Sequence, residues 1–167
     1  MHDELTQVDI DKMKAELQHR IHVLRPQLIE EVKVARSFGD LSENFEYKAA
    51  KREKNRNDSR IRYLENMIKT AVVIDGSSTG EGIALFDKVT FYLEDDDLEE
   101  TIQLVTTLRQ DALKGLISKE SPVGKALLGH KVGDRVRIQV NDSNFYYVQI
   151  RKVEKTREDP DLPISTF

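Results

Sequence analysis

The stretch that decides the fold reads Gly39-Asp40-Leu41-Ser42-Glu43-Asn44-Phe45-Glu46-Tyr47, a short polar turn between two long helical patterns. Upstream, apolar residues recur at steps of three and four, at Ile10, Met13, Leu17, Ile21, Leu24, Leu28, Val32, Ala35 and Phe38. Downstream, a weaker series follows at Ala49, Ala50, Ile61, Leu64, Ile68 and Ala71. Each series places one apolar stripe along a helix, so the pattern predicts an antiparallel helical hairpin packed along these stripes.

The predicted hairpin is long and thin. Each arm has roughly 30 residues and would extend roughly 45 Å, at ~1.5 Å per residue. Two carboxylates, Asp40 and Glu43, would lie at its far end. Pro26 interrupts the first pattern, but the apolar series continues beyond it, so we expect a bend there and not a helix end.

Composition narrows the class of protein. The chain of 167 residues has no cysteine, which excludes a disulfide framework and a thiolate metal site. A hydrophobic share of 38% supports only a modest core, and a charged share of 34% fits an extended, solvated surface. The sequence shows neither a leader pattern nor an apolar stretch long enough to cross a bilayer, so we expect a cytoplasmic protein without membrane contact.

Charge is distributed unevenly along the predicted hairpin. Its outer half is rich in lysine and arginine, and those nearest the turn are the candidates for contact with phosphates: Arg36, Lys48, Lys51, Arg52 and Arg56. Tyr47 could stack on a base or pack against the turn. The alternative is a solvated helix face, because Lys and Arg are good helix formers at surfaces.

The chain changes character after Ile74. We divide it into a helical hairpin at 1–75, a glycine-rich hinge at 76–82, a small domain at 83–155 and a tail at 156–167. Within the small domain, strand-like runs flank the acidic turn 94–97 and the polar turn 141–144, and Ser121-Pro122 begins a short helix. Antiparallel strands with one short helix predict an α+β fold overall. The proline-containing tail is expected to be uncovered.

Several sequence blocks point to one known family. They are Leu24-Arg25-Pro26, Ala35-Arg36-Ser37-Phe38-Gly39-Asp40-Leu41-Ser42-Glu43-Asn44, Glu46-Tyr47-Lys48-Ala49-Ala50-Lys51, Ala71-Val72-Val73-Ile74-Asp75, Ile117-Ser118-Lys119-Glu120-Ser121-Pro122, Ala126-Leu127-Leu128-Gly129 and Val132-Gly133-Asp134. On these blocks the chain resembles the bacterial Gre transcript-cleavage factors over nearly its whole length. The resemblance implies an N-terminal coiled coil and a C-terminal domain similar to the FKBP fold.

The resemblance also implies a function. Members of that family bind RNA polymerase, insert the coiled coil into its secondary channel and promote cleavage of the nascent RNA 3′ end by the polymerase itself. On this basis Asp40 and Glu43 would help to hold a Mg²⁺ ion shared with the polymerase, and they would position or deprotonate the attacking water. Ser118, Glu120 and Pro122 would form the docking loop. The protein would act as a monomer and would not itself be an enzyme.

Other interpretations remain open at this stage. The spacing Asp40-x-x-Glu43 is also that of a capping box, which would begin the second helix without binding metal. A relative that occupies the same channel and inhibits the polymerase would have the same architecture. A helical-hairpin RNA-binding or chaperone module is a third possibility, but it leaves the two carboxylates unexplained.

Overall fold

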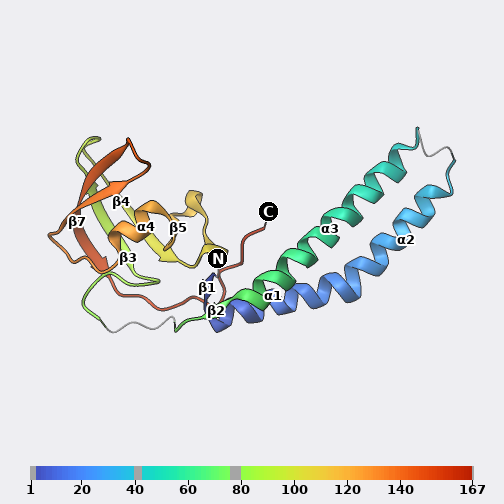
Figure 1. Ribbon diagram of the computed structural model, residues 1–167, viewed down its shortest axis with the longest axis horizontal. Helices are drawn as coiled ribbons and strands as arrows, with labels where there is room; N and C mark the ends of the chain where they lie inside the picture. Colours follow the sequence, from blue (N-terminus) through green and yellow to red (C-terminus); the bar gives the residue numbers. More distant parts are fainter. Residues whose placement is uncertain (1–2, 40–42, 76–79, 167) are drawn as a thin grey trace. The chain divides into compact units, whose positions relative to one another are not determined.

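The computed structural model describes residues 3–39, 43–75 and 80–166 (Figure 1). Contacts divide the chain into two compact units. The helical unit contains residues 1–3 and 10–71, and the sheet unit contains residues 4–9 and 72–167. The expected hinge at 76–82 therefore lies largely outside the described residues. No helix among the described residues is both long and apolar enough to span a membrane.

The helical unit is the antiparallel hairpin that the apolar stripes predict. One arm consists of α1 (Gln7–His19), a π-helical turn η1 (Arg20–Leu24) and α2 (Arg25–Arg36), and the other is α3 (Phe45–Thr70). The two arms run side by side (Figure 1). The helical path continues through Pro26 as expected, since the proline falls in the first turn of α2, where its missing N–H is not needed. The π-helical turn before it is the local departure from regular geometry.

The apolar packing between the arms is concentrated at one end of the hairpin. There Ile10, Met13, Ile61, Leu64 and Met67 are buried, whereas α2 buries only Ala35. The expectation that the stripe extends to Phe38 is wrong, because 64% of this side chain is exposed. The reason is that α2 ends at Arg36, so Phe38 no longer follows the helical spacing that would bring it against α3. The outer end of the hairpin therefore has little core of its own.

A buried polar layer interrupts the stripe, and the sequence pattern did not reveal it. Arg60 and Asn57 of α3 are buried at 4% and 3% exposure. Arg60 donates to Glu16 at 2.7 Å, and Arg20 donates both to Glu16 at 2.9 Å and to Asn57 at 2.9 Å. Buried polar pairs of this kind fix the register of packed helices, because a slip would leave their polar atoms without partners.

This layer gives the hairpin a predicted pH dependence. Burial alone would raise the pKa of Glu16, but the hydrogen bonds from Arg60 and Arg20 outweigh it and place the pKa below its usual value of 4.5. A carboxyl with a lowered pKa stabilises the fold above that usual value, and the stabilisation is lost as the pH falls through the folded-state pKa. Glu16→Gln should therefore lower the melting temperature at pH 7, and the difference from the wild type should close in acid. Helicity melts between pH 7 and pH 3 would measure this, and a constant gap would contradict it.

The sheet unit is built on five strands in the order β5-β4-β3-β7-β6. The strands are β3 (Lys88–Leu93), β4 (Leu98–Val105), β5 (Leu116–Ser118), β6 (Arg135–Gln139) and β7 (Phe145–Glu154). All neighbours are antiparallel except β4 and β5, which pair in parallel. Both expected strand pairs are present, and the helix that begins at Ser121-Pro122 is α4 (Pro122–Leu127). The mixed α+β class, with a helical hairpin and a mainly antiparallel sheet, is confirmed.

Alternating side chains of this sheet form the core of the unit. Its buried members are Ile83, Val89, Phe91, Ile102, Leu104, Leu127, Val136, Ile138, Val148 and Ile150. Helix α4 packs against β6, and its Leu127 enters the core. Gly124 allows α4 to approach the preceding turn closely, since a Cβ there would lie 2.2 Å from the Ser118 carbonyl oxygen. This contact fixes the loop between β5 and α4.

Strand β5 and several other short elements were not expected. Strands β1 (Glu4–Leu5) and β2 (Val72–Val73) pair in parallel, and β4 and β5 are joined by the 3₁₀ turns η2 (Thr107–Arg109) and η3 (Ala112–Lys114). Leu5 is fully buried, and its carbonyl accepts from the Ile74 amide at 2.8 Å. Residues 4–9 are thus part of the sheet unit.

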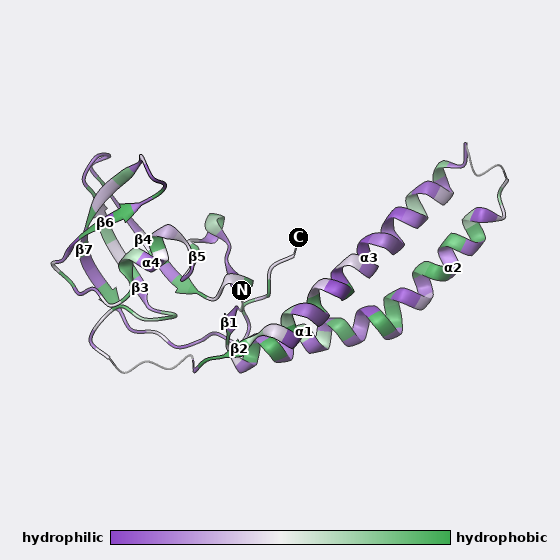
Figure 2. Ribbon diagram, viewed as in Figure 1, coloured by the Kyte–Doolittle hydropathy of each residue, from purple (hydrophilic) through white to green (hydrophobic). Residues whose placement is uncertain are grey.

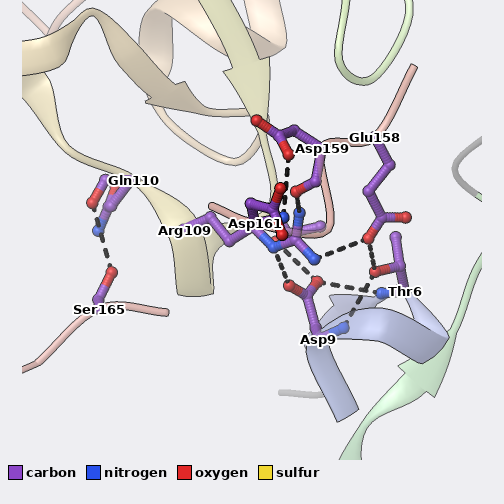
Figure 3. A network of polar contacts seen from close by, with 9 residues as sticks. Thr6, Asp9, Arg109, Gln110, Glu158, Asp159, Asp161 and Ser165 are labelled. Carbon is purple, nitrogen blue, oxygen red and sulfur yellow. Dashed lines mark hydrogen bonds and ion pairs between the residues drawn. The ribbon is translucent and has the colours of Figure 1, made fainter. Parts of the chain in front are cut away.

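The expectation of an uncovered tail is wrong. Arg109, which is 1% exposed, donates to Glu158 at 2.8 Å and to the Asp159 carbonyl at 2.9 Å (Figure 3). Leu162 packs against the small core cluster of Phe86, Val105 and Leu116. The tail therefore covers one end of the sheet unit, held there by a buried arginine that sequence periodicity does not flag.

Candidate functional site at the end of the helical hairpin

One described side chain, that of Asn44, links the end of α2 to the start of α3. Asn44 is the N-cap of α3, and its Oδ1 accepts from the Tyr47 amide at 3.0 Å. Its Nδ2 donates to the Ala35 carbonyl near the end of α2, at 2.7 Å. Asparagine is a favoured N-cap residue, and here its amide also ties the two helices together.

This geometry decides against the capping-box interpretation of Glu43. In a capping box, the acid lies three residues inside the helix that it helps to begin. Here α3 begins at Phe45, so Glu43 precedes its N-cap and is exposed. Asp40 lies outside the described residues. Among the described residues, the start of α3 is thus capped without Glu43, which leaves that carboxylate available for another role.

The described residues near the turn offer Glu43 as a ligand but not a complete cation site. In the described parts of the chain, no group of three or more His, Asp or Glu is arranged so that it could hold a metal ion. A carboxylate is nevertheless the kind of ligand that Mg²⁺ prefers, and Mg²⁺ commonly takes one or two carboxylates and completes its coordination with water or phosphate.

Cationic side chains gather around two aromatic rings beside this turn. Arg36 and Lys51 lie over the ring of Tyr47, at 5.5 and 6.0 Å from its centre, and Lys48 lies over Phe45 at 5.7 Å. A hydrogen bond with Arg36, supported by the charge of Lys51, lowers the pKa of the Tyr47 hydroxyl. The structure therefore brings Arg36 and Lys51 together.

The other two candidate RNA contacts are placed differently. Arg56 forms an ion pair with Glu53 at 3.2 Å on the surface of α3, which offsets its charge, and Arg52 is exposed. The five candidates consequently do not form one uniform stripe.

The expected docking loop lies between β5 and α4. Ser118 is buried, and its hydroxyl lies 3.0 Å from that of Thr107 and accepts from the Glu120 amide at 3.1 Å. Ser118 thus shapes the loop, whereas Glu120 and Pro122 are exposed. Both line a surface hollow of about 430 Å³, together with Lys125, Ala126, Arg137 and Gln139. Sequence reasoning missed Lys125 and Arg137, which only the pairing of α4 with β6 brings to this loop.

Comparison with known proteins identifies the class to which this architecture belongs. The family described as "Transcription elongation factor, N-terminal" matches residues 4–73, and the family described as "Transcription elongation factor, GreA/GreB, C-term" matches residues 79–155. The chain therefore belongs to the GreA/GreB family of transcription elongation factors.

Individual relatives agree with this assignment. The chain is 44% identical over 151 residues to transcription elongation factor GreA of Mesoplasma florum, covering 89% of this chain and 96% of that protein. It is 41% identical over 149 residues to GreA of Macrococcus caseolyticus, covering 89% and 94%.

Solved structures are also similar to the chain. GreA factor homolog 1 (Gfh1) of Thermus thermophilus is 26% identical, with 93% of this chain and 100% of that chain covered and a TM-score of 0.39. A GreA/GreB factor from Nitrosomonas europaea is 18% identical, with 93% and 99% covered and the same TM-score. A score at this level does not establish a shared fold, so the family assignment rests on the sequence matches.

Proposed function

We propose that this chain is a transcription elongation factor that binds RNA polymerase and places the end of its helical hairpin in the secondary channel. There it stimulates cleavage of the nascent RNA 3′ end in backtracked, arrested complexes, and the nuclease is the polymerase itself. The observation that carries the proposal is the arrangement of residues at the outer end of the hairpin. Asn44 caps α3, and the neighbouring Glu43 carboxylate is exposed and is not part of that cap.

Asp40 and Glu43 would act as carboxylate ligands at the hairpin end. A Mg²⁺ ion held jointly with the polymerase would supply activation of water and stabilisation of charge on the leaving oxygen. The exposed carboxylate of Glu43 can contribute an oxygen ligand and accept a hydrogen bond from the attacking water. Asp40 is assigned the same role from the family motif.

The cationic residues behind the turn would bind the extruded RNA. Arg36 and Lys51 are held beside Tyr47, so they are positioned to contact phosphates near the carboxylates. Lys48, Arg52 and Arg56 would continue the contact along α3, and Arg56 would contribute less because it is already paired with Glu53.

The sheet unit would dock the protein on the polymerase. Glu120 and Pro122 would make contact at the surface hollow, and buried Ser118 would hold the loop in shape. We also propose that this domain is FKBP-like, since its mainly antiparallel sheet packs one short helix, α4, against its core. The factor would work as a monomer in the cytoplasm.

A single assay tests the proposal. Purified protein is added with Mg²⁺ to a stalled, backtracked polymerase complex whose RNA carries a label. We expect shortened transcripts and released 3′ fragments, and no cleavage of the same RNA when the polymerase is omitted, because two carboxylates cannot build a two-metal site alone. Slowed elongation without shortening would instead identify a channel-binding inhibitor, and cleavage without polymerase would make the protein a nuclease.

A further inference from the structure

One flank of the hairpin carries a groove between α2 and α3, near its outer end. The groove has a volume of about 490 Å³. Its apolar floor is formed by Val34, Ala35, Phe38 and Ala50. Acidic side chains stand around this floor, namely Glu30, Glu31 and Glu46. We refer to it as the acidic-apolar groove.

The apolar side chains on the floor of the groove are unusually exposed to solvent. Phe38 is 64% exposed and Val34 is 47% exposed. Hydrophobic residues continue along α2 almost to its outer end (Figure 2), although this part of the hairpin has little core to receive them. Adjacent apolar side chains that stay in water within a charged surface are a mark of an interaction site.

The opposite flank of the hairpin has the opposite charge. Arg36 follows Val34 by two residues, so it projects about 200° further around the helix. It lies over Tyr47 together with Lys51, and on the same flank Arg25 lies 3.6 Å from Asp58. One flank is thus suited to phosphates, whereas the glutamates of the other would repel them.

We propose that the acidic-apolar groove binds a protein segment that presents an apolar side chain flanked by lysine or arginine. The apolar side chain would cover Val34 and Phe38, and the cations would face Glu30, Glu31 and Glu46. This inference rests on the proposed function, in which the segment belongs to the polymerase. It adds that the hairpin enters the channel in one orientation. The groove faces the polymerase, and the flank that carries Arg36, Tyr47 and Lys51 faces RNA.

Two substitutions on the same helix test the groove. Val34→Lys places a positive charge on its floor, where it should repel a cationic partner. Ile29→Lys is the matched control, since Ile29 is also β-branched, 42% exposed and on α2, but five residues away and therefore about 140° around the helix. We expect Val34→Lys to weaken binding to the backtracked polymerase complex by about tenfold or more and Ile29→Lys to change it by less than about threefold.

A second measurement identifies what faces the groove. A photo-crosslinking residue replaces Gln27, which lines the groove, or Lys33, which lies about 120° away from Gln27 on the same helix. In the backtracked complex, position 27 should crosslink to a polymerase subunit and not to RNA. RNA crosslinks at position 27, or equal binding by the Val34→Lys and Ile29→Lys variants with unchanged helicity, would overturn the groove assignment.

The wild type separates this failure from failure of the proposed function. If the wild type cleaves backtracked RNA and Val34→Lys binds as well as Ile29→Lys, only the groove assignment falls. If the wild type neither binds polymerase nor shortens RNA, both fall together.

Discussion

Replacing either carboxylate by its amide, Asp40→Asn or Glu43→Gln, is expected to reduce stimulated RNA cleavage by roughly a hundredfold or more. Loss of groups that only support metal ligands already costs about 10–100-fold, so loss of a ligand should cost at least as much. Binding to the polymerase should stay within about twofold, because a single contact at the end of the hairpin contributes little beside the docking loop and the flanks. Cleavage rates and competition binding on one backtracked complex measure both quantities.

Asn44→Ala provides the control for a purely structural effect. It removes the cap of α3 and the tie to Ala35, which should cost about 1 kcal/mol of stability and lower the melting temperature. Glu43→Gln should leave the melting temperature unchanged. Raising the Mg²⁺ concentration should partly restore cleavage by Glu43→Gln and not by Asn44→Ala. If Glu43→Gln instead lost stability and binding like the cap variant, the carboxylate would be part of the turn and not of the chemistry.

Glu43 and Asn44 illustrate which features of the structure can be predicted from the sequence and which cannot. Apolar spacing predicts the hairpin because burial along a helix repeats every 3.6 residues, and Ser121-Pro122 predicts the start of α4 because its cap is local. The start of α3 was harder to place. Asp40, Ser42 and Asn44 are all suitable caps, and spacing alone does not choose among them within one turn. The contact between Asn44 and Ala35, nine residues apart, makes the choice.

Contacts between distant segments account for the remaining differences. The stripe was extended to Phe38 because spacing does not show where α2 ends. Asn57 and Arg60 do not resemble core residues until Glu16 and Arg20 meet them from the other arm. The tail, with its two prolines, resembles a loose end until Arg109, some 50 residues earlier, binds Glu158. In each case the partner is fixed by the tertiary fold, so no local pattern carries the information.

Replacing Arg109 is expected to cause the largest loss of stability. It donates to Asp9 at 2.6 Å, and both side chains are completely buried (Figure 3). Asp9 further accepts from the Thr106 hydroxyl at 2.8 Å and from the Thr6 amide at 3.1 Å. The pair thus joins residues 4–9, the loop after β4 and, through Glu158, the tail, all within the sheet unit.

Arg109→Met should therefore destabilise the protein by about 3–5 kcal/mol, because it leaves the Asp9 carboxylate buried without its cation. For a chain of this size that corresponds to a fall in melting temperature of about 10 °C. Arg135→Met makes the same substitution in the same unit, at a surface ion pair in which Arg135 donates to Glu94 at 2.8 and 3.0 Å. It should lower the melting temperature much less, because water screens and solvates exposed charges. Thermal melts of the two variants measure this difference. Equal falls in melting temperature would mean that burial adds nothing to the Asp9–Arg109 pair. A much larger fall for Arg109→Met would identify the pair as the contact that holds residues 4–9 and the tail within the sheet unit.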